Sequence, residues 1–234
     1  MFYGIELAGI ELLCIFGIGE LLRSSFRNIN PVIYYWLIIT VITGFLWEPA
    51  FVYQYRQVQT YADLLIINNT SVWFDKYTLD YLIPHKFSMI FYSTYGAWAD
   101  REYMDIGNYW SRIIESTHAL FCGLFAALCL VFYLWGDKSH YNLLLGVSMG
   151  SQLMNSILYM GEYFIQTADI NSPNYDTAFF PTGRFLSARP FMWINIFWTI
   201  MPLYAIITMM FGTNRVQLRN TPYRYSAPLI KSKY

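Results

Sequence analysis

Long apolar runs separated by short polar stretches dominate the chain. Five of these runs reach the length of about 20 residues that an α-helix needs to cross a bilayer. They are residues 5–22, 31–55, 109–135, 141–165 and 190–211. The pattern predicts an all-α integral membrane protein with a single transmembrane domain over residues 1–234, built as a five-helix bundle.

The segment between the second and third runs, residues 56–108, is more polar, and we expect a long loop there. Within it, residues 87–98 (FSMIFYSTYGAW) are aromatic but too short to cross a bilayer. Such a stretch is typical of an interfacial or re-entrant element, because aromatic rings favour the membrane boundary.

Basic residues predict the orientation in the membrane. The connections after the first, third and fifth runs hold one acid, Asp137, and eight bases, which are Arg23, Arg27, Lys138, Arg215, Arg219, Arg224, Lys231 and Lys233. The positive-inside rule then places the C-terminal tail, residues 212–234, in the cytoplasm and the loop 56–108 in the lumen. Overlapping glycosylation acceptors at Asn68 and Asn69 agree with a lumenal loop.

Composition supports a membrane protein and excludes several functions. Only 13% of the 234 residues are charged, against about 25% in an average soluble domain. The net charge is zero, so we expect no nucleic-acid partner. Metal-ligand spacings and nucleotide motifs are missing from the sequence, so we expect no metal and no cofactor. The string GVSMG at 146–150 matches a nucleophile motif, but it lies inside an apolar run and not between a strand and a helix.

Polar side chains inside the runs are the residues that lipid would reject, since an ionised Glu near the centre of a span costs about 3 kcal/mol. They are Glu11 in the first run, Glu48 in the second, Arg112, Glu115 and His118 in the third, Gln152, Asn155, Tyr159 and Glu162 in the fourth, and Asn195 and Trp198 in the fifth. We expect them to face the bundle interior and to line a pocket for a lipophilic ligand with one polar end.

Two local arrangements are predicted for the carboxylates. Arg112 and His118 lie three residues on either side of Glu115, so we expect both to share its helix face and bracket it. Pro49 removes one helix hydrogen bond and frees the Phe45 carbonyl, which we expect to accept from a protonated Glu48.

This set of residues fits chemistry on carbon-carbon double bonds. A buried carboxyl group keeps its proton and can deliver it as a general acid, a role that we assign to Glu48. Glu115, kept ionised by Arg112, would accept a proton or stabilise positive charge. Trp198, with Trp47, Tyr109 or Tyr159, offers π faces that stabilise a cation by about 1–2 kcal/mol. Such a site moves a double bond or closes a ring.

Several motifs resemble a known family. Asn195, Trp198 and Pro202 have the spacing N-x-x-W-x-x-x-P, and Glu115, Ala119 and Gly123 have the spacing E-x-x-x-A-x-x-x-G. Together with GAW at 96–98 and LYMGE at 158–162, they make residues 43–211 similar to the emopamil-binding protein (EXPERA-domain) family, which includes the sterol double-bond isomerase. The resemblance implies that Glu115 handles protons, that Trp198 faces the cation, and that the protein resides in the endoplasmic reticulum membrane.

The second run departs from that family and is similar to another. Where the family places a His and, four residues later, a Glu, this chain has Trp47 and Phe51. The string FLWE at 45–48 instead looks like the F-x-W-E element of small fungal transmembrane terpene cyclases. That likeness implies that Glu48 protonates an olefin or an epoxide.

The sequence therefore leaves three functions open. The first is an isomerase or cyclase of a sterol or terpenoid, with Glu48 and Glu115 catalytic and with Trp47, Arg112, His118, Asn155, Tyr159, Glu162, Asn195 and Trp198 binding the substrate. The second is a non-catalytic lipid receptor, trafficking factor or transporter, and the third is a structural subunit of a membrane complex. The expected partners are the bilayer and a lipophilic isoprenoid, and association into a homodimer stays open.

Overall fold

The part of the chain that the structure describes folds almost entirely into helices. The computed structural model describes residues 1–104, 109–175, 189 and 192–211. Its α-helices are α1 (Gly4–Arg23), α2 (Pro31–Ile42), α3 (Glu48–Tyr53), α4 (Tyr55–Asn68), α5 (Pro84–Trp98), α6 (Trp110–Thr117), α7 (Leu124–Leu134), α8 (Lys138–Ala168) and α10 (Trp193–Met210). Short 3-10 helices occupy Ser24–Phe26, Leu79–Leu82 and Glu102–Met104. Two short strands, β1 (Phe2–Tyr3) and β2 (Lys76–Tyr77), pair antiparallel.

Four helices in the described part of the chain are long and apolar enough to cross a membrane. They span Pro31–Tyr53, Trp110–Leu134, Lys138–Ala168 and Trp193–Met210. The prediction of an all-α membrane protein is confirmed at this level, since these helices coincide with the second to fifth apolar runs. The first run also forms a helix, α1, but it is more charged than the other four because it carries Glu6, Glu11, Glu20 and Arg23.

Polar residues fix where two of the spans begin. Asn30 precedes Pro31, and its Oδ1 atom accepts from the backbone nitrogen of Val32 at 2.9 Å, which caps the start of α2. The Asp137 side chain accepts from the backbone nitrogen of His140 at 3.1 Å at the start of α8. Gly136, with φ of 78°, makes the turn that precedes this cap.

The segment expected to be a long loop is largely helical. It contains α4 and α5, which pack on each other, and the aromatic stretch 87–98 lies within α5. Ser93 of α5 donates to the Val58 carbonyl of α4 at 3.1 Å, both being buried. The prediction of a long loop was therefore wrong over most of this segment. The sequence did not indicate α5 as a helix, because the stretch is too short to cross a bilayer and its aromatic residues are equally typical of an interfacial segment.

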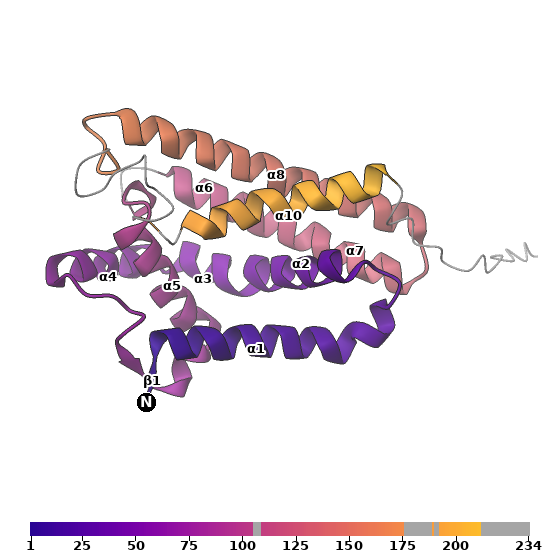
Figure 1. Ribbon diagram of the computed structural model, residues 1–234, viewed down its shortest axis with the longest axis horizontal. Helices are drawn as coiled ribbons and strands as arrows, with labels where there is room; N and C mark the ends of the chain where they lie inside the picture. The colour runs from indigo at the N-terminus through magenta and orange to yellow at the C-terminus, as the bar shows by residue number, and fades with distance from the viewer. Residues whose placement is uncertain (105–108, 176–188, 190–191, 212–234) are drawn as a thin grey trace, which may run out of the picture.

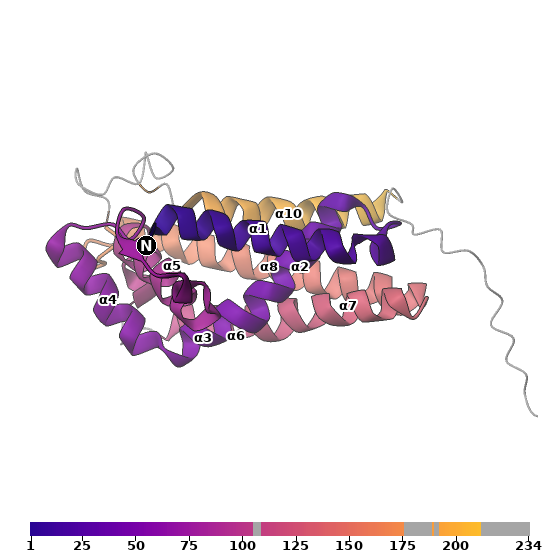
Figure 2. The same ribbon diagram turned by 90° about the horizontal axis from the view of Figure 1, so that it is seen from below.

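The long helices run side by side along the molecule. Helix α8 packs against α7 and α10, while α1 packs against α2 (Figure 1). Figure 2, turned by 90°, shows the same lengthwise alignment, with α4 at one end of the bundle. The N-terminus lies at the end of the bundle where α4 and α5 gather.

Two π-helical segments cross where the spans Pro31–Tyr53 and Trp110–Leu134 meet. They are η2 (Thr43–Trp47) and η5 (His118–Gly123). A Cβ atom on Gly44 would lie 2.8 Å from the Cα atom of Gly123, so only glycine permits this approach. In η2 the backbone nitrogen of Glu48 bonds to the carbonyl of Thr43, five residues earlier. Each segment adds a residue to its turn and so rotates the side chains beyond it.

Candidate functional site

A cavity of about 620 Å³ lies inside the bundle. Its volume is typical of a small-molecule site, for which about 300–1,000 Å³ is usual. Side chains from α1, α2, η2, α3, α5, α6, η5, α8 and α10 line it, and most of them are aromatic or aliphatic. The cavity therefore suits a largely apolar ligand.

The cavity collects most of the residues predicted from the sequence. Eight of the ten line it, namely Trp47, Glu48, Glu115, His118, Asn155, Tyr159, Asn195 and Trp198. Glu11 and Gln152, noted as polar residues inside apolar runs, line it as well. The prediction that carboxylates from separate helices share one chamber with Trp198 agrees with this arrangement.

Arg112 was wrongly placed beside Glu115. Its guanidinium stacks over the ring of Tyr109, 4.3 Å from the centroid, and over that of Tyr55 at 4.6 Å. Among the described residues no ion pair joins Arg112 to Glu115, and Arg112 does not line the cavity. The three-residue spacing predicts neighbouring Cβ atoms for Arg112 and Glu115, but the guanidinium group instead stacks on the rings of Tyr55 and Tyr109.

Glu162 also lies apart from the main cavity. Its Oε1 atom accepts from Gln166 Nε2 at 3.5 Å. It lines a separate space of about 10 Å³, which it shares with Asp100 and Gln166. Glu162 does share a side of α8 with Tyr159, since both line this small space, but it lies nearly one turn further along the helix and so misses the main cavity.

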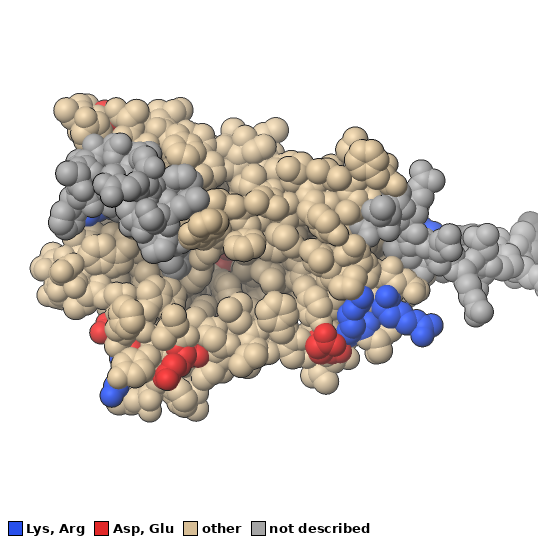
Figure 3. All heavy atoms as spheres, in the orientation of Figure 1, with Lys and Arg blue, Asp and Glu red and all other residues tan. Residues whose placement is uncertain are grey.

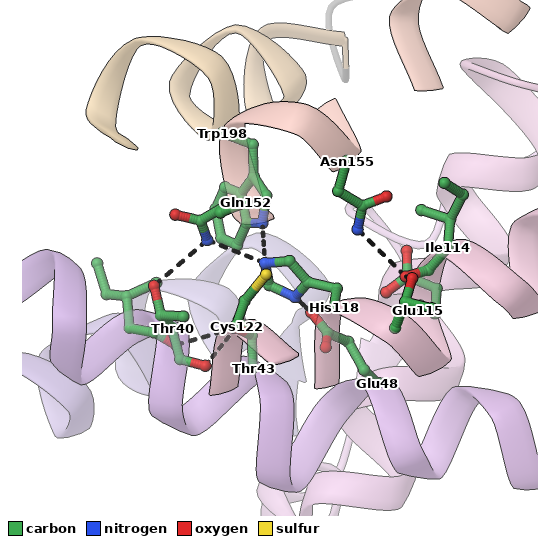
Figure 4. Close-up of polar contacts among 12 residues, drawn as sticks. Thr40, Thr43, Glu48, Ile114, Glu115, His118, Cys122, Gln152, Asn155 and Trp198 are labelled. Carbon is green, nitrogen blue, oxygen red and sulfur yellow. Dashed lines mark hydrogen bonds and ion pairs between the residues drawn. The ribbon is translucent and has the colours of Figure 1, made fainter. Parts of the chain in front are cut away.

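Glu48 is held by a side chain from another helix and not by the Phe45 carbonyl. The Nδ1 atom of His118 hydrogen-bonds to Glu48 Oε1, and both residues are buried (Figure 4). The second oxygen, Oε2, has no hydrogen-bond partner among the described residues. The expected acceptor at Phe45 was therefore wrong, because η2 turns the Glu48 side chain toward the span Trp110–Leu134.

The direction of the hydrogen bond between His118 and Glu48 follows from its neighbours. Trp36 Nε1 can only donate, and it lies 2.6 Å from Gln152 Oε1, so the amide oxygen of Gln152 faces Trp36. The amide nitrogen of Gln152 then faces His118 Nε2 at 2.9 Å. Trp198 Nε1, another obligate donor, lies 3.1 Å from the same nitrogen (Figure 4).

His118 Nε2 consequently accepts from two N–H groups and carries no hydrogen. The hydrogen of the neutral ring must be on Nδ1, from which it is donated to Glu48. A second proton on the ring would displace at least one of the two donors. This arrangement fixes the tautomer of His118 and gives Glu48 a donor that strengthens when the carboxyl group becomes ionised.

Glu115 occupies another part of the cavity wall. Its Oε2 atom accepts from the Tyr92 hydroxyl at 3.1 Å. Burial, with Glu115 and Glu48 nearby, raises the pKa of Tyr92 well above its ordinary value, so the phenol stays protonated and donates. Asn155 lies beside Glu115 and donates to the Ile114 carbonyl at 3.2 Å (Figure 4).

Aromatic rings surround the polar atoms. The Trp36 and Trp198 rings meet edge to face with centroids 4.7 Å apart. Trp47 lies 5.2 Å from Phe87 between ring centroids. Both Trp36 and Phe87 line the cavity and were missed in the sequence, because aromatic residues are so frequent in this chain that no single one stands out. The π faces make the chamber suitable for a positively charged intermediate.

The cavity opens between α1 and α10. Leu12 of α1 and Phe197 of α10 both line it, yet they are 48% and 55% exposed. Figure 3 shows this face hollowed between the two helices, with acidic atoms at depth. The rim is apolar and faces sideways from the bundle, toward the position that lipid would occupy around the spans.

Ser148, in the string GVSMG, has a structural role. It is buried in the middle of α8 and donates to the Cys122 carbonyl at 2.9 Å. It lies in a continuous helix, so it lacks the strand-to-helix turn that exposes a nucleophilic serine.

Comparisons with protein-family models, curated proteins and solved structures found no match to this chain. The motif resemblances thus have no support from whole-chain similarity. Function has to be argued from the geometry of the cavity.

Proposed function

We propose that the protein is a membrane-embedded isomerase or cyclase that acts on a sterol or terpenoid without a cofactor. The reaction begins with protonation of a carbon-carbon double bond or an epoxide by Glu48. The resulting carbocation then loses a proton at another carbon, which moves the double bond or leaves a new ring.

The hydrogen bond between His118 and Glu48 is the observation that supports this proposal most. An acid that gives up its proton inside an apolar cavity becomes an unsolvated anion, which is costly. The Nδ1–H of His118 offsets this cost because a hydrogen bond to a carboxylate is about twice as strong as one to a neutral group. His118 is therefore a positioning residue that makes Glu48 an effective donor.

Positive charge on the substrate is stabilised by groups elsewhere on the cavity wall. Trp36, Trp47 and Trp198 present π faces, each contributing about 1–2 kcal/mol when water is excluded. Glu115, whose Oε2 atom accepts from Tyr92, acts as a charge stabiliser. Removing water also protects the intermediate from capture as an alcohol.

The opening between α1 and α10 supports a substrate that arrives from the bilayer. We infer that α1 is a fifth membrane helix, since its exposed face is apolar at Leu12, Leu13 and Phe16. The same inference keeps the tail 212–234 cytoplasmic and residues 56–108 lumenal, in the endoplasmic reticulum membrane. Glycosylation mapping at Asn68 and Asn69 tests this orientation.

Turnover by the purified protein tests the function. The protein in lipid nanodiscs is incubated with ring-unsaturated sterols and with farnesylated phenols bearing a terminal olefin or epoxide, and isomeric products are sought by mass spectrometry. We expect a product whose formation falls by about 10²-fold or more in Glu48→Gln. Asp63→Asn, at an exposed carboxylate on α4 outside the cavity, is the control and should keep its activity.

A terpene cyclase is the second candidate within this proposal, favoured by the FLWE string that ends at Glu48. A cyclic product from the epoxide substrates, with the sterols unchanged, supports it. Saturable binding of these lipids without any product instead supports a non-catalytic lipid-binding protein. Absence of both binding and product favours a structural subunit.

A further inference from the structure

A second hydrogen-bonded group meets the cavity away from Glu48. Asn195 Nδ2 donates to the Tyr95 hydroxyl at 2.6 Å, and the Tyr95 and Tyr159 hydroxyls are hydrogen-bonded to each other. The Tyr159 hydroxyl lies 2.5 Å from Asp100 Oδ2. Asn195, Tyr95 and Tyr159 line the cavity, whereas Asp100 lies behind them.

The donors around Asp100 fit an ionised carboxylate that accepts at both oxygens. The backbone nitrogen of Arg101 can only donate, and it lies 2.7 Å from Asn174 Oδ1, so the amide nitrogen of Asn174 faces Asp100 Oδ1 at 2.6 Å. The backbone nitrogen of Tyr103 donates to the same oxygen at 3.1 Å. An ionised Asp100 satisfies all of these donors.

The direction of every hydrogen bond in this series follows. Tyr159 has one hydroxyl hydrogen and gives it to Asp100, so its oxygen accepts from Tyr95. The Tyr95 oxygen in turn accepts from Asn195. Every hydroxyl hydrogen therefore points from the cavity toward Asp100.

We propose that Tyr95, Tyr159 and Asp100 form the route by which the proton released from the carbocation leaves the cavity. This deepens the proposed function and rests on it. A C–H bond next to the cationic carbon breaks, and its electron pair becomes the new double bond. The proton binds the Tyr95 oxygen while the Tyr95 hydrogen moves to Tyr159 and the Tyr159 hydrogen moves to Asp100.

The transfer is balanced and leaves a defined state to reset. Glu48 ends as a carboxylate, Asp100 ends as a neutral acid, and the hydroxyl hydrogens of Tyr95 and Tyr159 point back toward the cavity. Asp100 also borders the small space of about 10 Å³ near Glu102 and Glu162, which is close to the room that one water needs. Through it Asp100 returns its proton to solvent.

Burial of Asp100 supports this role. It raises the pKa of the carboxyl group above its ordinary value, so the group is a stronger base than an exposed aspartate. Burial and Asp100 also raise the pKa of Tyr95 well above normal. Tyr95 therefore passes a proton on in concert with its neighbours and does not form a lasting phenolate.

Deuterium labelling separates this route from a purely structural network. In D₂O, Glu48 delivers deuterium to a terminal =CH₂ carbon and makes a –CH₂D methyl group that rotates. Reversal by loss of H then leaves deuterium in the recovered substrate, whereas product forms only if a proton leaves another carbon. The probe is a terpenoid phenol with a terminal 1,1-disubstituted olefin, because an epoxide protonated on oxygen, or a ring carbon protonated on one face, would return the same deuteron on reversal. Tyr159→Phe and Tyr95→Phe each remove one hydroxyl group from the hydrogen-bonded series. Tyr55→Phe is the control, because this buried phenol lies outside the main cavity.

We expect Tyr95→Phe and Tyr159→Phe to raise the ratio of deuterated substrate to product by about tenfold or more over the unmodified protein. The control should keep the original ratio, and thermal unfolding should show all three variants folded. Equal losses of exchange and product, or no change in either, overturn the route while leaving Glu48 as donor. If the unmodified protein shows neither exchange nor product, the proposed function itself fails, and the route with it.

Discussion

Gly44 and Gly123 meet backbone to backbone, and this contact brings Glu48 within hydrogen-bond reach of His118. Each glycine lies in one of the two π-helical segments, one turn from the side chain that it positions. A Cβ atom at Gly44 would meet Gly123 Cα at 2.8 Å, a contact that no side-chain rotation relieves. The helix crossing and the proposed acid are therefore linked.

Gly44→Ala should loosen this contact and weaken the proposed reaction. The helices must separate by some tenths of an ångström, which costs about 1–3 kcal/mol as overpacking does elsewhere. We expect a lower midpoint of thermal unfolding and at least a several-fold loss of turnover. Gly150→Ala is the matched control, because it also lies within a spanning helix and its Cβ would meet nothing within 4 Å. Equal behaviour of the two variants would contradict the argument.

Sequence reasoning located the cavity residues well because lipid excludes them. Glu48, Glu115 and Asn195 are polar groups inside apolar runs, and the bundle interior is the place where their burial can be compensated. Their shared location in one cavity follows from that exclusion. It needs no knowledge of the helix order in space.

The partners of these residues could not be predicted in the same way. The spacing of Arg112 from Glu115 assumes that two neighbours on one face must interact, yet stacking on Tyr55 and Tyr109 is an alternative that only the fold reveals. The η2 and η5 segments have no clear signature in the sequence, so the meeting of Glu48 and His118 was not foreseen.

Asp100 was missed for a different reason. It follows the aromatic stretch 87–98, which was interpreted as part of an interfacial loop, where a carboxylate is unremarkable in any sequence. The packing of α5 against α3 and α4, with Tyr159 of α8 against the carboxyl group, buries it. A charged residue directly after a buried aromatic helix is the signal that could have identified it.

Trp198 has two roles that two substitutions can separate. Trp198→Phe keeps an aromatic face but removes the N–H that donates to His118 Nε2. Trp198→Ala removes both. We expect the Phe variant to lose a modest part of its turnover, since Gln152 still holds His118, and the Ala variant to lose about tenfold more, in line with a cation–π energy of about 1–2 kcal/mol. Steady-state rates at saturating substrate decide this, and identical losses would mean that the ring face is not used.

Leu12→Trp should slow entry of substrate through the opening between α1 and α10. Leu12 lines the cavity and is partly exposed, whereas its neighbour Leu13 is 72% exposed and does not line it. Leu13→Trp therefore adds the same bulk without narrowing the opening. We expect kcat/KM for a bilayer-dissolved substrate to fall several-fold in Leu12→Trp alone. If Leu13→Trp lowers it equally, entry occurs elsewhere.

The stability of the protein should depend on pH through Asp100. Its pKa is raised by burial, so the folded state binds this proton more tightly than the unfolded state does. As pH rises above the ordinary range of an aspartate, the unfolded chain releases the proton first, and Asp100 increasingly destabilises the fold until its own pKa is passed. Asp100→Asn removes this cost and still offers an amide oxygen to Asn174 and the Tyr103 backbone.

The difference in unfolding midpoint, variant minus unmodified protein, should therefore shift in favour of Asp100→Asn as pH rises from about 4 to 8. Thermal unfolding in detergent across this range measures it. Asp63→Asn, at an exposed position on α4, serves as the control and should give a difference that varies less with pH. A difference for Asp100→Asn that stays constant, or that moves against the variant with rising pH, would mean that the hydrogen bonds from Tyr159, Asn174 and Tyr103 outweigh the cost of burying the carboxylate.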